Sequence, residues 1–360
     1  MKRNYKLVLV IFFAVSIVYA AFLVMSENYI MFREEIQYIK FNEGDSFYTP
    51  YKNDLPWEIN VIYNEINSLS SENNLILIGA STTREGIIPE QLATPAKWKL
   101  KNMAIGADTI YSFRLMRNYL NSYANHKPDK TDIVVIHIFY GSFSITSPKN
   151  DYLRQTIEML GTYQVDDSAQ VHGYMSGMRK LWELSNYKIR FALGLNEGSV
   201  GKSLVYAVRD FGTKSIRLII GDSNEIHNSS PTAEDLAKYR TFWTTYTQNV
   251  TFPGKSTDDF KELLKELKSQ TNVVIVNLYV PSWHRTYPSE QEYENWTRAD
   301  LIPFLNEQGI SWIDLSRSIP DSEYGDSVHL FKGGRENYTK QFSTAISPIL
   351  SNFDRLQKFN

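Results

Sequence analysis

The stretch that decides the fold reads LILIGASTTR over residues 75–84. Its four consecutive apolar residues, 75–78, predict a short buried strand that ends at Gly79. Ser81 follows two residues later, where a helix can begin with the serine hydroxyl exposed above the sheet. Serine also caps helices routinely, so this stretch alone favours a plain helix N-cap.

Alternating strands and helices continue toward the C-terminus. Apolar runs predict further strands over residues 98–105, 133–140, 273–280 and 310–315. Amphipathic spacing predicts helices over residues 109–123, 258–269, 290–308 and 332–350. Strands that are apolar on both faces and alternate with helices indicate a parallel sheet covered on both sides. The sequence therefore predicts an α/β domain over residues 73–350, with about five parallel strands and a functional site at their carboxyl ends.

The alternation weakens over residues 141–255, which we interpret as a large insertion for substrate recognition or a lid. This part contains a second serine candidate, Gly221-Asp222-Ser223, after an apolar run at 216–220. Only two clear strands follow it before Asp326, and the polar residues 224–231 are typical of a loop. The order of elements therefore favours Ser81 over Ser223 as a nucleophile.

The partner residues for Ser81 lie in GDSVHL at residues 325–330, between a strand and the last helix. An aspartate three residues before a histidine can hydrogen-bond the imidazole and set its tautomer. The other ring nitrogen is then free to take a proton from a serine. Because this is the last loop of the predicted domain, the order of residues along the chain favours a triad of Ser81, His329 and Asp326.

In this order of motifs the chain resembles the SGNH/GDSL-type hydrolases and acyltransferases, in their membrane-anchored bacterial envelope branch. Gly79-Ala80-Ser81 is similar to the Gly-Asp-Ser of that family, with alanine in the middle, and Asp326 and His329 match its final Asp-x-x-His. The resemblance implies a flavodoxin-like sheet. It also implies an oxyanion hole formed by the backbone N–H groups of Ser81 and Gly106, the glycine after the second strand.

After the third strand, this chain departs from the sequence motif of the family. The family commonly has Gly-x-Asn-Asp after the third strand, and the asparagine donates to the oxyanion, whereas this chain reads Tyr140-Gly141-Ser142. Either Ser142 or a group from the insertion replaces the asparagine, or the hole has only its two backbone donors. Losing one donor costs on the order of 10²-fold in rate.

Other polar residues near the predicted site have open roles. Arg84 either binds an anionic substrate group or forms a salt bridge, and Trp283 and His284 follow the fourth strand as candidate substrate contacts. His137 lies inside the third strand, where a core role is expected. The remaining histidines have no partner at metal-ligand spacing, so we expect neither a metal nor a cofactor.

The N-terminus predicts a membrane anchor. Residues 7–25 carry no charge and are numerous enough to cross a bilayer as one helix, while Lys2, Arg3 and Lys6 precede them. The positive-inside bias keeps this end in the cytoplasm and places the rest outside. We expect an anchor over residues 1–27, a stem over 28–72 and an extracytoplasmic domain over 73–350. A cleaved signal peptide is the alternative.

Composition and resemblance together narrow the function. The 360 residues include no cysteine, which excludes disulfides and cysteine nucleophiles, and a net charge of −2 offers no basic field for nucleic acid. The resemblance implies O-acyl transfer or removal, with acetyl as the acyl group, on a cell-envelope or exported polysaccharide. Other envelope proteins of polysaccharide modification are the expected partners. The alternatives are a non-catalytic glycan-binding protein that retains the fold, and a lipase or esterase.

Overall fold

The computed structural model of the chain describes residue 15 and residues 65–66, 68–71, 73–93, 95, 97–106, 109–144, 148, 151–159, 164–172 and 231–357. The chain divides into two compact units, and the unit made of Phe41–Ile157, Tyr163–Gly173 and Glu225–Asn360 contains the sheet and the candidate site. Apart from Val15, the predicted membrane segment lies outside the described residues, as does Ser223. Within the described ranges, no helix combines the length and the apolar character needed to cross a bilayer.

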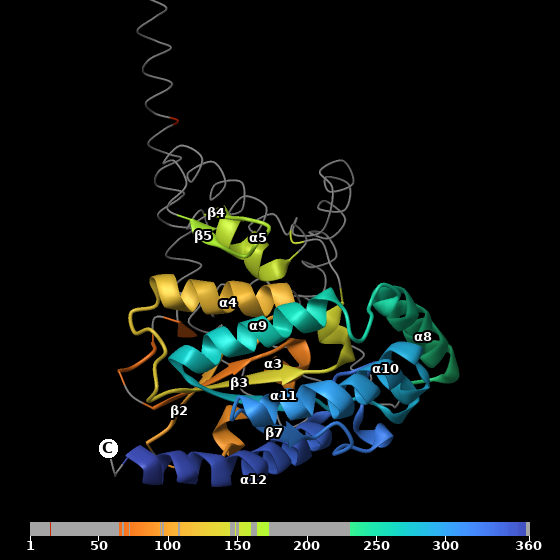
Figure 1. Cartoon of the computed structure of the whole chain (residues 1–360). Helices are drawn as coiled ribbons and strands as arrows, with labels where there is room; N and C mark the ends of the chain where they lie inside the picture. The colour runs from red at the N-terminus through yellow and green to blue at the C-terminus, as the bar shows by residue number, and fades with distance from the viewer. Residues whose placement is uncertain are drawn as a thin grey trace, which may run out of the picture. The chain divides into compact units, whose positions relative to one another are not determined.

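Five parallel strands form one sheet in the order β2–β1–β3–β6–β7 (Figure 1). Their bounds are β1 Asn74–Ile78, β2 Lys99–Asn102, β3 Ile133–Ile138, β6 Asn272–Asn277 and β7 Ser311–Asp314. The first strand, β1, lies inside the sheet. β2 pairs with one side of it, and β3, β6 and β7 follow in chain order on the other side. In such a doubly wound sheet the winding direction reverses between β1 and β3, and ligands bind at the carboxyl ends there. The predicted five-stranded parallel α/β sheet is confirmed.

The central strands β1 and β3 are mostly apolar, which suits strands that are covered on both faces. Every side chain of NLILI and of IVVIHI is buried, as parallel sheets between helices require. β3 ends at Ile138, earlier than predicted, because residues 140–143 turn into the 3-10 helix η4 (Tyr140–Phe143). β6 likewise ends at Asn277 rather than at residue 280, so the strand ends before the buried apolar run does.

Helices cover the sheet on both sides (Figure 1). α4 (Ile110–Tyr123) and α9 (Lys255–Gln270) lie on one face, and α12 (Lys332–Gln357) lies on the other with the short α3 (Ser81–Gly86). α12 buries residues at four-residue intervals, which form one apolar stripe: Tyr338, Phe342, Ile346 and Leu350. The predicted helix at 290–308 comprises α10 (Pro288–Trp296), the π-helical turn η7 (Thr297–Leu301) and α11 (Ile302–Glu307).

Part of the predicted insertion packs onto the sheet domain. Its described elements are α5 (Tyr152–Met159), the antiparallel pair β4 (Gln164–Val165) and β5 (Val171–His172), and α8 (Ala233–Thr247). From α8, the buried Trp243 makes an edge contact with Phe139 at the end of β3, with ring centroids 5.7 Å apart. α8 is therefore an integral cover of the carboxyl end of the sheet.

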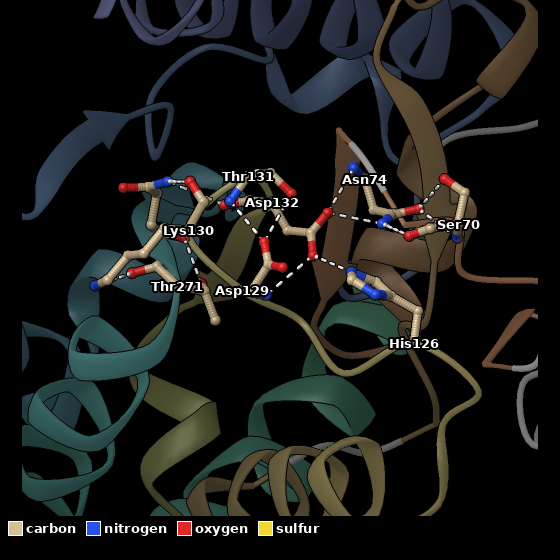
Figure 2. A network of polar contacts seen from close by, with 9 residues as sticks. Ser70, Asn74, His126, Asp129, Lys130, Thr131, Asp132 and Thr271 are labelled. Atoms are coloured by element: carbon tan, nitrogen blue, oxygen red, sulfur yellow. Dashed lines mark hydrogen bonds and ion pairs between the residues drawn. The ribbon is translucent and has the colours of Figure 1, made fainter. Parts of the chain in front are cut away.

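A buried carboxylate joins the amino ends of β1 and β3 (Figure 2). Asp132 Oδ1 accepts hydrogen bonds from the backbone N and the Nδ2 of Asn74, at 2.8 and 2.7 Å. Asp132 Oδ2 accepts from the Asp129 backbone N and lies 3.0 Å from His126 Nε2. His126, Asp129 and Asp132 are all metal-ligand types, but these bonds already occupy both oxygens of Asp132. We interpret the network as structural, because an unpaired carboxylate at this depth is costly.

Candidate active site

Ser81 is the first residue of α3, and Gly79 and Ala80 connect it to the carboxyl end of β1 at Ile78. The tight exit from the strand requires glycine at position 79, since a Cβ there would lie 2.2 Å from Thr83 Oγ1 and 3.0 Å from His137 Cβ. The carbonyl of Ala80 then accepts hydrogen bonds from the backbone N–H groups of Thr83 and Arg84. Ser81 thus stands beside β3, at the edge where the strand order reverses.

Three predicted site residues come together in one hydrogen-bonded chain. His329 Nε2 lies 2.9 Å from Ser81 Oγ, and His329 Nδ1 lies 2.8 Å from Asp326 Oδ2. Because a carboxylate oxygen can only accept, Nδ1 carries the proton toward Asp326. In the neutral imidazole, Nε2 is then the acceptor facing the serine hydroxyl. This arrangement can take a proton from Ser81 as its oxygen attacks.

The Asp326 carboxylate is oriented by its own loop. Its Oδ1 accepts from the backbone N–H groups of Val328 and His329, both at 2.8 Å. The Gly325 N–H donates to the His329 backbone carbonyl at 2.9 Å, and the Phe331 N–H donates to the Glu323 backbone carbonyl at 2.8 Å. These two bonds close the loop just before α12. Backbone N–H groups of the same turn therefore hold the Asp326 carboxylate toward His329.

The charges of Glu85, Asp326 and His329 shift the pKa values of both Asp326 and His329. Burial favours a higher pKa for Asp326, but the charge of His329 and the hydrogen bonds lower the pKa below its usual value. Burial favours a lower pKa for His329, but Glu85 and Asp326 outweigh it and raise the pKa to about 9. Glu85 Oε2 lies 3.8 Å from His329 Nε2, and the Glu85 side chain is only 5% exposed. The resting imidazole is consequently protonated near neutral pH.

Glu85 was not predicted from the sequence, although its position carries a signal. It lies four residues after Ser81, so both side chains point to the same face of α3. Its other oxygen, Oε1, accepts from Arg84 Nη2 at 2.7 Å, and the Glu85 backbone carbonyl accepts from Arg335 Nε of α12. Of the two roles left open for Arg84, the structure favours the salt bridge, because the Arg84 side chain is 4% exposed.

His284 requires a correction. The sequence indicated a substrate contact, but the side chain is fully buried and both ring nitrogens bond within the protein. Nε2 lies 2.9 Å from the Ser327 carbonyl oxygen, and Nδ1 lies 2.6 Å from the Tyr140 hydroxyl. Trp283, its neighbour in the 3-10 helix η6 (Ser282–Thr286), is half-buried and stacks with Tyr239 of α8 at a centroid distance of 6.5 Å. A role of Trp283 in substrate binding stays a prediction.

The candidate oxyanion donors lie on the neighbouring strands. Gly106 is buried just after β2, where the Ile105 N–H donates to the Gly79 carbonyl at 2.9 Å. Ser142 is buried in η4, and its hydroxyl accepts from the Phe139 N–H at 3.3 Å. Their donation to a reacting oxygen stays a prediction. His137 is the core residue that was expected, since it is fully buried in β3 and its pKa is lowered to about 3 by burial.

Comparisons with known proteins add little to this picture. No protein-family model matches the sequence, and no curated protein matches it. Among solved structures, the chain is similar to a catalytic mutant of Axe2, an acetylxylan esterase from Geobacillus stearothermophilus. That likeness has a TM-score of 0.39 and 11% sequence identity, and it covers 77% of this chain and 95% of the other. At this TM-score the likeness carries no argument about the function of this chain.

Proposed function

We propose that the chain is a serine-dependent enzyme that acts on acyl esters. The observation that carries this proposal is the 2.9 Å contact between Ser81 Oγ and His329 Nε2, with Asp326 on the opposite ring nitrogen. A serine that only caps a helix does not require a neighbouring imidazole that a carboxylate orients. The location at the carboxyl ends of β1 and β3 supports the same conclusion, because this is where doubly wound sheets bind ligands.

The proposed reaction has two half-reactions. Ser81 Oγ attacks the carbonyl carbon of an ester while its proton moves to His329 Nε2, and Asp326 stabilises the resulting imidazolium. When the tetrahedral intermediate collapses, the C–O bond to the alcohol breaks and the alcohol takes the proton from Nε2. A second hydroxyl then gives its proton to Nε2 and attacks the acyl-serine. When this second intermediate collapses, the bond from the acyl carbon to Ser81 Oγ breaks and Oγ takes the proton back from Nε2. Water as that second acceptor gives hydrolysis, and a sugar hydroxyl gives transfer.

The proposed substrate is an O-acylated glycan of the cell envelope or an exported polysaccharide, with acetyl as the acyl group. Two features support a sugar ligand: the half-buried pair Tyr239 and Trp283, and the closeness of this pair to the reactive loop. The pKa of Tyr239 is raised by burial and by the negative charge of Asp326, so α8 and Asp326 interact. Aromatic faces beside a reactive serine suit the apolar faces of sugar rings. Transfer rather than removal is favoured by the absence of the family asparagine near Ser142.

The proposed location is outside the cytoplasm, on a single N-terminal membrane helix over residues 7–25. The support is the uncharged run itself and the three basic residues before it. Protease added to intact spheroplasts should degrade the domain, while protection of the domain would contradict this orientation. An N-terminus that starts after residue 20 in the mature protein would favour the cleaved signal peptide.

The nucleophile is tested by labelling the full chain with a fluorophosphonate probe, which reacts with activated serines. We expect a single adduct on Ser81 in the wild type, none in Ser81→Ala, and normal labelling in Ser223→Ala, the matched control at the second serine candidate, Gly221-Asp222-Ser223. Release of p-nitrophenol from p-nitrophenyl acetate should follow the same order. Undiminished labelling of Ser81→Ala would show that the nucleophile is wrong. A folded wild type that takes no label would favour the glycan-binding alternative.

A further inference from the structure

A second hydrogen-bonded chain, whose two side chains are fully buried, lies beside the loop that contains Asp326 and His329. It runs from the Tyr140 hydroxyl in η4 to His284 Nδ1 at 2.6 Å, and from His284 Nε2 to the Ser327 carbonyl at 2.9 Å. Tyr140 and His284 are both 0% exposed. The chain therefore joins the carboxyl end of β3, the segment after β6, and the loop that contains Asp326 and His329.

The chemistry of the acceptor determines the tautomer of His284. A backbone carbonyl can only accept, so Nε2 must carry the hydrogen that it donates to Ser327. Burial lowers the pKa of His284 to about 3, so the ring is neutral and Nδ1 has no hydrogen. The Tyr140 O–H is then the donor to Nδ1. Each polar atom in this series of hydrogen bonds is therefore either a donor or an acceptor. The Tyr140 hydroxyl selects the His284 tautomer that donates to the Ser327 carbonyl.

The carbonyl that His284 holds belongs to the peptide between Ser327 and Val328. The N–H of that same peptide donates to Asp326 Oδ1 at 2.8 Å. His284 and Asp326 thus hydrogen-bond to the same peptide group, His284 to its carbonyl oxygen and Asp326 to its N–H. Rotation of this peptide plane would withdraw the Val328 N–H from Oδ1 and leave the His329 N–H as the one remaining backbone donor of the two, which weakens the hold on the carboxylate that faces His329 Nδ1.

We propose that His284 is a positioning residue that fixes the Ser327–Val328 peptide, and through it the orientation of Asp326 toward His329. The role presupposes the proposed function of Ser81, Asp326 and His329. The ring of Trp243 in α8 packs against both members of the chain, with centroids 5.8 Å from Tyr140 and 5.2 Å from His284. The buried Trp243 ring thus packs beside the buried hydrogen bond between Tyr140 and His284, and a hydrogen bond is stronger in such low-dielectric surroundings.

The experiment compares two tyrosine-to-phenylalanine variants of the full chain that differ in one hydrogen bond. Tyr140→Phe removes the donor to His284 Nδ1. Tyr287→Phe is the matched control, because the Tyr287 ring also contacts His284, at 5.6 Å, while its hydroxyl has no hydrogen-bond partner among the described residues. His284→Phe removes both hydrogen bonds, and His284→Gln keeps a side chain that both donates and accepts.

Two readouts separate positioning from mere folding. The rate of fluorophosphonate labelling at saturating probe should fall by about 10- to 100-fold in Tyr140→Phe and further in His284→Phe, since small misplacements cost up to ~10²-fold. His284→Gln should recover part of this loss, and the affinity for the probe should change little. In ¹⁵N-histidine NMR spectra, the low-field signal of the proton between His329 Nδ1 and Asp326 should weaken or shift in Tyr140→Phe and stay unchanged in Tyr287→Phe.

The outcomes are distinct. If Tyr140→Phe and Tyr287→Phe label at equal rates and leave the His329 proton signal unchanged, His284 does not position the loop. If both variants lower the rate equally, the effect is one of packing and the proposal is also overturned. If the wild type takes no label but the His329 proton signal responds to Tyr140→Phe alone, the positioning role stands and the proposed function fails.

Discussion

Replacement of Glu85 by glutamine is the most informative test of the site electrostatics. Glu85 places a buried carboxylate 3.8 Å from His329 Nε2, on the side of the ring that faces Ser81. Burial favours a lower pKa for His329, and the charges of Glu85 and Asp326 raise it to about 9 instead. Only a neutral imidazole can take the serine proton. The rate constant for reaction of the free enzyme should therefore rise with pH through about 9.

Stability should follow the opposite trend over the same pH range. Because the pKa of His329 is higher in the folded chain than in the unfolded chain, the imidazolium stabilises the fold below the ordinary histidine value of about 6.5. That contribution is lost progressively as the pH rises through about 9. We therefore expect the fold to lose stability from this group in the same window in which the serine gains reactivity.

The size of the Glu85 effect follows from the distance. Two unit charges about 4 Å apart interact with about 4 kcal/mol at an effective dielectric constant near 20, and about 1.4 kcal/mol corresponds to one pKa unit. Arg84 neutralises part of the Glu85 charge, and the His329 side chain is 21% exposed, so solvent screens it further. We expect Glu85→Gln to lower the pKa of His329 by roughly 1 to 2 units.

The assay is the rate of fluorophosphonate labelling across the alkaline range, for the wild type and Glu85→Gln. The midpoint of the rising limb should move to lower pH in Glu85→Gln, so that labelling at neutral pH becomes faster. Glu294→Gln is the matched control, since it breaks the ion pair between Glu294 and Arg317, on α10 and after β7, and should leave the midpoint in place. A midpoint that stays fixed, or rises, in Glu85→Gln would refute the electrostatic reasoning.

Three further substitutions test the geometry. Gly79→Ala should cost about 1–3 kcal/mol in urea unfolding and reduce labelling, because the new Cβ meets Thr83 and displaces Ser81; normal labelling would show that the tight exit is not needed. Asp326→Asn should slow labelling by about 10³- to 10⁴-fold through the wrong imidazole tautomer, and a wild-type rate would remove Asp326 from the mechanism. Asp132→Ala should cost about 2–4 kcal/mol because the buried Asn74 backbone N–H loses its acceptor and the Asn74 side chain keeps only its bonds to Ser70, yet label normally when folded; unchanged unfolding would contradict its structural role.

The fold was largely predictable because its central strands are unambiguous. Runs such as 75–78 and 133–136 are too short for helices and are apolar throughout, which in a chain with intervening amphipathic helices leaves few alternatives. Strand ends were less predictable. Residues 278–280 are as apolar as the strand before them, but Leu278, Tyr279 and Val280 pack in the core outside the ladder.

The site was predictable where it depends on local spacing and not where it depends on distant contacts. Asp326 and His329 are three residues apart, and Ser81 comes three residues after the first strand ends, so their meeting at one site could be predicted from the order of motifs. His284 looked like a surface ligand because it follows Trp283 at the functional edge. Its true partners, Tyr140 and Ser327, are 144 and 43 residues away, and no spacing rule connects them.

The strand order also bears on when reactivity can arise during synthesis. The sheet grows outward in the order in which the ribosome delivers its strands, from β3 to β6 to β7. Ser81 emerges early, but His329 follows 248 residues later. In a nascent chain, Ser81 therefore has no contact with His329 until the last loop folds onto the sheet. A chain exported in stages would complete this contact only after nearly all of it had crossed.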